Sequence, residues 1–171
     1  MKIDKLTISK KVVITGFLIA VGIVLQIAEG MFNAFVIPGG KVGIANIVSL
    51  IDLFVMGSGN ALLVAVLRAF LGSIIYGGVS TIPYSVGGAV VSVMVIIIVK
   101  KMFYPKLSLI GISVVGAFFH NLTQILVATT IFKSFDLFYY LPVLTIVGTI
   151  GGILTGYVAM LFCKKAGLIK I

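Results

Sequence analysis

The sequence predicts an all-α integral membrane protein with six transmembrane helices. Of its 171 residues, 61% are hydrophobic and only 10% are charged, and the mean hydropathy is +1.31. A water-soluble domain carries about 25% charged residues, because its surface must meet water. Charged residues and glycine-rich turns also divide this chain into apolar segments of helical length. A soluble globular enzyme and a disordered chain are therefore excluded.

The apolar segments follow one another in a single transmembrane domain, residues 1–171. We predict helices at about 12–30, 42–56, 60–76, 83–99, 107–132 and 137–163. The second segment is short for a full span. The first segment follows two lysines, as a signal peptide would, but no clear small-residue cleavage site comes after it. We therefore expect a retained first helix.

Positive charges predict the orientation of these helices. With both termini in the cytoplasm, ten lysines fall on the cytoplasmic side, and only Lys41 and Lys133 fall outside. This distribution follows the positive-inside rule, which the reverse topology would violate. The net charge of +9 therefore indicates orientation in a lipid bilayer rather than binding to nucleic acid. We expect a multi-pass protein of the cell membrane.

Two charged residues lie within predicted helices, where a charge costs about 2.5–3.5 kcal/mol on insertion scales. Asp52 and Arg68 belong to neighbouring antiparallel helices, and their predicted depths differ by only about 6 Å. One hypothesis is a structural ion pair between them. The other is that Arg68 faces a cavity, where its guanidinium suits a carboxylate or phosphate of an anionic substrate.

Further polar residues form two candidate groups. His120, Asn121 and Gln124 lie near the middle of the fifth helix, where polar groups line a cavity or join helices. His120 and Gln124 are four residues apart and share a helix face, although a single buried histidine is more often a packing residue. The glycine-rich stretch 38–46 contains Lys41 and Asn46, and its backbone N–H groups could hold an anion. The alternative for this stretch is a plain re-entrant turn.

Small residues predict where helices approach closely. Gly148, Gly152 and Gly156 recur every four residues, and Gly16 and Ala20 repeat the spacing in the first helix. Such residues let another backbone approach, which matters because lipid offers no hydrophobic drive between helices. Each motif serves packing within the chain or docking of a partner membrane protein. Glu29, at the outer end of the first helix, is most simply an interfacial charge.

Signatures of catalysis are missing from the sequence. The chain has one cysteine and one histidine, so no metal cluster is expected, and no phosphate-binding loop for ATP occurs. Its three aspartates are isolated, whereas magnesium-assisted diphosphate chemistry needs clustered carboxylates. We therefore expect no catalytic residue, no cofactor and no enzymatic activity.

Three motifs carry a family resemblance. They are PGGKVGIANIVSL at 38–50, LLVAVLRAFLGSIIYGG at 62–78 and GAFFHNLTQILVA at 116–128. Together they resemble the Gx transporter family, whose members are often labelled heptaprenyl diphosphate synthase component I. These proteins are also similar to the substrate-binding S components of energy-coupling factor (ECF) transporters. The resemblance implies an S-component-like bundle of six helices with cytoplasmic ends.

The resemblance also implies a function and partners. An S component binds a vitamin or cofactor precursor and works with a transmembrane coupling subunit and two cytoplasmic ATPases. Gly16 and Ala20 stand where S components dock the coupling subunit. The implied pocket opens outward, near 38–46, Tyr84 and the His120 group. The expected substrate-binding residues are Lys41, Asn46, Arg68, Tyr84, His120, Asn121 and Gln124. The alternative from another class is a membrane subunit or anchor of a prenyl-diphosphate, quinone or redox enzyme assembly.

Overall fold

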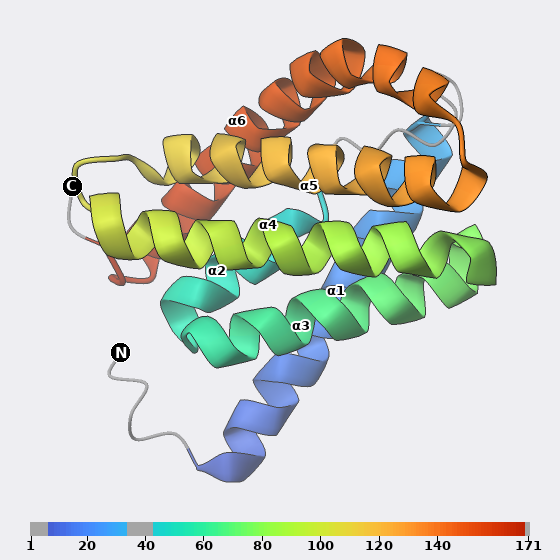
Figure 1. Cartoon of the computed structure of the whole chain (residues 1–171). Helices are drawn as coiled ribbons and strands as arrows, with labels where there is room; N and C mark the ends of the chain where they lie inside the picture. Colours follow the sequence, from blue (N-terminus) through green and yellow to red (C-terminus); the bar gives the residue numbers. More distant parts are fainter. Residues whose placement is uncertain (1–6, 34–42, 170–171) are drawn as a thin grey trace.

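The computed structural model describes residues 7–33 and 43–169. These residues contain six α-helices and no strand, which confirms the predicted all-α fold (Figure 1). The helices are α1 (Ile8–Asn33), α2 (Asn46–Val55), α3 (Ser58–Gly72), α4 (Ile82–Phe103), α5 (Leu109–Phe132) and α6 (Leu141–Lys165). Short helical turns precede or follow three of them: η2 (Ser73–Gly77), η3 (Val79–Thr81) and η4 (Phe135–Tyr140).

Five of the helical segments in the described ranges are long and apolar enough to cross a membrane. The exception is α2, whose 10 residues would extend about 15 Å. That is about half of the hydrocarbon thickness of a bilayer. The six predicted helices are thus present, and the second is short, as its sequence indicated.

Local sequence explains several helix ends. Gly57 ends the α2–α3 turn with φ of +95°, a backbone conformation that a residue with a Cβ rarely adopts. The Ser108 side chain caps α5 by accepting a hydrogen bond from the Gly111 backbone N–H. Pro83 and Pro142 stand in the first turns of α4 and α6, where a missing N–H costs little.

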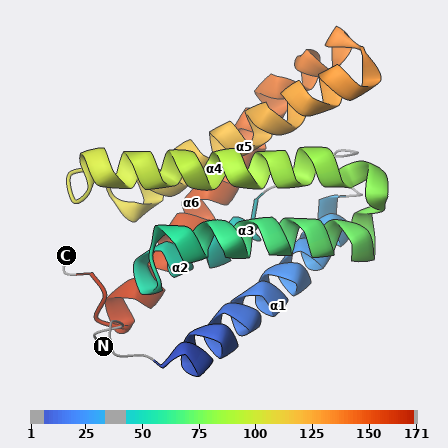
Figure 2. The same ribbon diagram turned by 60° about the horizontal axis from the view of Figure 1, so that its bottom comes forward.

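The helices form a bundle in which sequence neighbours are also spatial neighbours. Helix α3 packs between α1 and α4, and α5 packs between α4 and α6. The short α2 contacts α1, α3, α4 and α6. Figures 1 and 2 show the α4–α5 connection and the end of α6 on one side of the bundle, and the α3–α4 and α5–α6 connections on the other.

Lysines gather at one of these two ends. The lysines of the first end belong to the start of α1, the last turn of α4, the α4–α5 connection and the end of α6: Lys10, Lys11, Lys100, Lys101, Lys106, Lys164 and Lys165. The opposite end carries Lys133 and the exposed Tyr139 and Tyr140. We refer to the first as the lysine-rich end. Its charge supports the predicted cytoplasmic side.

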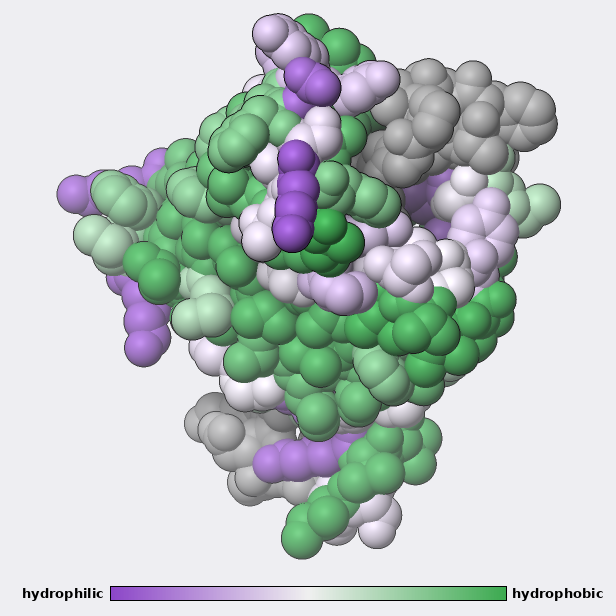
Figure 3. Space-filling model, turned by 45° about the vertical axis from the view of Figure 1, so that its right-hand side comes forward, coloured by the Kyte–Doolittle hydropathy of each residue, from purple (hydrophilic) through white to green (hydrophobic). Residues whose placement is uncertain are grey.

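Apolar side chains cover much of the outer surface. Phe17 on α1 is 67% exposed and Ile146 on α6 is 63% exposed, and many other large apolar residues are similarly open. Hydrophobic residues cover a broad central area of the face in Figure 3, and hydrophilic residues form separate patches above it, below it and at its left edge. Lipid can cover such a surface, whereas water would not favour it.

The glycine stripe of α6 serves packing within the chain. A Cβ at Gly152 would lie 2.8 Å from the Val114 Cα, and a Cβ at Gly156 would lie 2.7 Å from the Ile110 Cα. Both of these contacts are with the backbone of α5. Glycine therefore lets the two helices approach closely. By contrast, Gly16 and Ala20 on α1 are exposed, and a Cβ at Gly16 would meet nothing within 4 Å.

Candidate polar site

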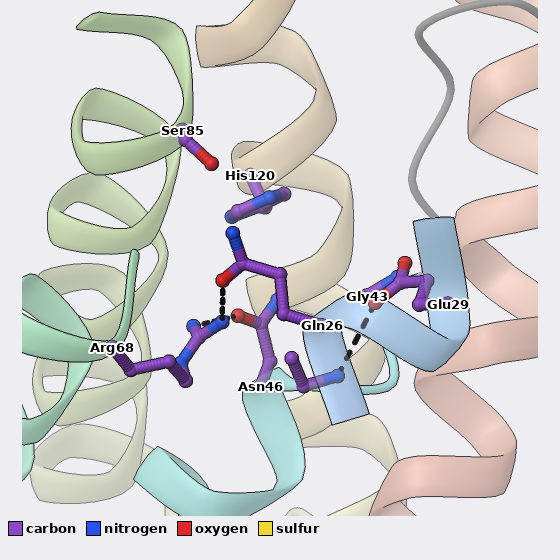
Figure 4. A pocket seen from close by; sticks show the side chains of 8 residues that line it. Gln26, Glu29, Gly43, Asn46, Arg68, Ser85 and His120 are labelled. Atoms are coloured by element: carbon purple, nitrogen blue, oxygen red, sulfur yellow. Dashed lines mark hydrogen bonds between the residues drawn. The ribbon is translucent and has the colours of Figure 1, made fainter. Parts of the chain in front are cut away.

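A polar cavity lies between α1, α2, α3, α4 and α5, in the half of the bundle away from the lysine-rich end (Figure 4). Its lining consists of Gln26, Glu29, Gly43, Ala45, Asn46, Arg68, Ser85 and His120. Three of the predicted site residues, Asn46, Arg68 and His120, therefore meet here from three different helices. All three are buried.

Arg68 contacts side chains from two other helices in the cavity. Its Nη2 donates to the Asn46 Oδ1 at 2.8 Å, and its Nη1 donates to the Gln26 Oε1 at 3.4 Å. The described residues offer no hydrogen-bond acceptor to its Nε. A Cβ at Gly22 would lie 2.5 Å from the Arg68 Cδ, so the aliphatic stem of Arg68 packs directly on α1. The side chain is 3% exposed.

Gln26 lies between the Arg68 guanidinium and the His120 ring in Figure 4. A Cβ at Gly72 on α3 would come within 2.9 Å of its carboxamide atoms. Gly72 thus makes room for the Gln26 amide, as Gly22 makes room for the Arg68 stem. The two side chains cross the α1–α3 interface in opposite directions.

Glu29 fastens the segment that enters α2. Its Oε1 accepts from the Gly43 backbone N–H, and its Oε2 accepts from the Ala45 backbone N–H at 3.3 Å. The interpretation of Glu29 as an interfacial charge is wrong, because the residue is only 3% exposed. Both carboxylate oxygens are used to hold backbone N–H groups, which are strong partners for an anion.

His120, Asn121 and Gln124 do not all face the cavity. His120 lines the cavity, and Gln124 lies beside it: a Cβ at Gly88 would be 3.1 Å from the His120 Cε1 and 2.9 Å from the Gln124 Cγ. Asn121 instead donates to the Leu144 carbonyl oxygen of α6 at 2.8 Å. Adjacent helical residues point about 100° apart, so Asn121 joins helices while His120 faces the cavity.

The predicted ion pair between Asp52 and Arg68 does not form. Asp52 is fully buried and accepts from the Asn60 Nδ2 at 2.8 Å, while Arg68 has the partners described above. The helix bounds explain this. Asp52 is three residues from the end of α2 and Arg68 is ten residues from the start of α3, so their depths differ by about 10 Å rather than 6 Å.

The remaining predicted residues lie apart from the cavity. Tyr84 is half-buried on α4 next to Ser85, but only Ser85 lines the cavity. Lys41 lies outside the described residues, as do positions 38–42 of the glycine-rich stretch. In the described ranges, no group of three His, Cys, Asp or Glu side chains is placed to hold a metal ion.

Sequence reasoning missed Gln26, Glu29 and Ser85. A signal for the first two was available, because Gln26 and Glu29 are three residues apart in an otherwise apolar helix and so share one face. No comparable signal marks Ser85, since serine can satisfy its hydroxyl within its own helix.

The cavity is small in this arrangement. Its volume is about 10 Å³, which is roughly the room that one water molecule needs. The polar side chains fill the remaining space by contacting one another. A larger ligand therefore has to displace contacts between these side chains in order to bind.

The family model described as heptaprenyl diphosphate synthase component I matches residues 18–162. The match covers well over half of the chain and includes all residues that line the cavity. No curated protein and no solved structure matches the chain.

Proposed function

Because the chain belongs to the heptaprenyl diphosphate synthase component I family, which is the Gx transporter family, we propose that it is the substrate-binding S component of an ECF-type importer. The observation that carries this proposal is the polar cavity around Arg68. Ionisable residues are expensive inside a membrane bundle, and those that occur there usually mark a substrate pathway or a pairing partner. The hydrogen-bond acceptors of Arg68 among the described residues are neutral amide oxygens rather than a carboxylate, which favours a substrate site.

The position of the cavity suits uptake from outside. The cavity lies away from the lysine-rich end, which we assign to the cytoplasmic side of the cell membrane. A vitamin or cofactor precursor would bind there, the protein would reorient in the membrane, and partner ATPases would drive release. Arg68 and His120 would contact the substrate, with Gln124 supporting His120.

The exposed small-residue face of α1 supports a docking site for the coupling subunit. Gly16 and Ala20 are open, and Phe17 beside them is 67% exposed. Small residues permit close backbone approach by another membrane helix. The glycines of α6 offer no such face, because α5 already covers them.

A second candidate is a membrane subunit or anchor of a prenyl-diphosphate, quinone or redox enzyme assembly, which the name of the family favours. Catalysis by this chain itself has little support, since its aspartates at positions 4, 52 and 136 are far apart in sequence. We therefore propose that the chain is not an enzyme in either case.

Co-purification from native membranes tests the proposal. Tagged protein is isolated in mild detergent, and its partners are identified by mass spectrometry. We expect a transmembrane coupling subunit with paired ATPases. Ala20→Phe should reduce their recovery, whereas Val158→Phe, at a position on α6 that is 49% exposed, should not. Recovery of prenyl-synthase or redox subunits without an ATPase would refute the transporter proposal.

A further inference from the structure

The partners of Arg68 carry information about the substrate. We infer that the substrate presents a carboxylate or phosphate group, which binds the Arg68 guanidinium in place of the amide oxygens of Gln26 and Asn46. This inference rests on the proposed function, since it names the substrate class for the same cavity.

The electrostatic argument begins with the burial of Arg68. A buried cation is costly unless it is paired and hydrogen-bonded. Arg68 is 3% exposed, yet its two acceptors are neutral amide oxygens, and its Nε has no acceptor in residues 7–33 and 43–169. Glu29 lines the same cavity and its charge acts on Arg68 through space, but its oxygens accept from the Gly43 and Ala45 backbone, and the described residues contain no direct ion pair between the two side chains. The cation is thus hydrogen-bonded but not neutralised by a direct contact.

The geometry favours an anion with two oxygens. Nη1 and Nη2 each bind one oxygen, and these oxygens come from two different helices, α1 and α2. A carboxylate or phosphate presents two oxygens in the same fork, and such bidentate pairs are stronger than bonds to neutral acceptors. The longer contact, 3.4 Å to Gln26, is the weaker of the two and the easier to replace.

The size of the cavity makes this replacement necessary. At about 10 Å³ it cannot admit a charged group beside the two amides. An entering anion must therefore displace Asn46, the first residue of α2, and Gln26 on α1. A neutral group could displace them too, but it would leave Arg68 buried without a directly bound anion. His120 and Ser85 lie on the far side of Gln26 from Arg68 in Figure 4, where they can meet the rest of the substrate.

The experiment uses the full chain in lipid nanodiscs. Wild type and variants are incubated with the small-molecule filtrate of a rich growth medium and washed, and the retained solutes are identified by mass spectrometry in both ion modes. Arg68→Gln removes the positive charge. Arg68→Lys keeps the positive charge but lacks the paired Nη1 and Nη2 donors of the guanidinium. Lys133→Asn is the matched control, because it removes one positive charge from an exposed position at the same end of the bundle.

We expect wild type and Lys133→Asn to retain an acidic or phosphorylated solute. Arg68→Gln should bind it about 100-fold more weakly, with Arg68→Lys in between. Asn46→Ala, which removes a competing oxygen, should retain at least as much as wild type. If Arg68→Gln does not fold, Asn46→Ala tests the inference instead: a loss of solute retention by Asn46→Ala overturns it.

Other outcomes separate the inference from the function on which it rests. A neutral or cationic solute would overturn the substrate class and leave the S-component proposal standing. An acidic solute that folded Arg68→Gln retains as well as wild type would overturn the role of Arg68. Retention of no solute above that of empty nanodiscs would overturn the proposed function itself.

Discussion

The close contact between Gly22 and Arg68 allows a sharp test of the site. A Cβ at Gly22 would lie 2.5 Å from the Arg68 Cδ and 3.1 Å from its Cγ. Carbon atoms pack best at about 3.5–4.0 Å, so Gly22→Ala must push the Arg68 stem away by about 1 Å. The 2.8 Å hydrogen bond to Asn46 would then exceed the range of a normal hydrogen bond.

The expected loss of stability can be estimated from these contacts. Overpacking costs about 1–3 kcal/mol, and losing a hydrogen bond to a charged group costs about 1.5–3 kcal/mol. Alanine recovers up to about 1 kcal/mol of helix propensity over glycine. Gly22→Ala should therefore reduce the free energy of unfolding by about 2–4 kcal/mol. In a chain of this length, that corresponds to a drop of about 4–16 °C in the unfolding temperature.

Gly16→Ala is the matched control for this measurement. Gly16 lies on the same helix, and an added Cβ there would meet nothing within 4 Å. Its replacement should leave the unfolding temperature unchanged or raise it slightly. Both variants are compared with wild type by thermal unfolding in the same detergent, followed by circular dichroism. Equal unfolding temperatures for the two variants would refute the packing of Arg68 on α1.

Three further predictions concern contacts elsewhere in the bundle. Asp52→Asn should cost less than about 1 kcal/mol in chemical unfolding, because Asp52 has no cationic partner in the part of the chain that the structure describes; a cost of about 3–5 kcal/mol would instead indicate a broken buried ion pair. Glu29→Ala should accelerate hydrogen exchange at the Gly43 and Ala45 backbone amides, which lose their acceptor; unchanged exchange would contradict that contact. Gly152→Ala should lower the unfolding temperature more than Gly59→Ala, because only the first places a Cβ against a neighbouring backbone.

Hydropathy predicts the helices well for a physical reason. Lipid cannot hydrogen-bond the backbone, so an apolar segment in a membrane must satisfy its own N–H and C=O groups and becomes helical. The predicted segment 107–132 differs from α5 by two residues at its start, and Gly57 lies between α2 and α3, where the sequence predicts a turn. The errors lie at both ends of the bundle: α1 begins four residues before its predicted start, and α4 ends four residues after its predicted end. Residues 135–140, partly assigned to the last helix, form the separate turn η4.

Contacts between helices were harder to predict than the helices themselves. The Asp52–Arg68 pair was inferred from residue spacing along two segments whose ends were placed a few residues wrongly. At 1.5 Å per residue, such errors change a relative depth by several ångströms, which is enough to exchange one partner for another. Rotation about the helix axis matters equally: His120 and Asn121 are adjacent in sequence but contact different neighbours.

Glycines on three helices make room for the polar side chains of the cavity. Gly22 on α1 accommodates the Arg68 stem, Gly72 on α3 accommodates the Gln26 amide, and Gly88 on α4 accommodates His120 and Gln124. A larger residue at any of these positions would occupy the volume of a polar side chain. Glycine within a helix lowers its stability by about 1 kcal/mol relative to alanine in soluble hosts. At these three positions the glycines therefore cost helix stability but make room for the polar side chains. The polar residues alone therefore do not specify the site. The small residues opposite them determine where each long side chain can lie, and hence which groups a substrate would meet.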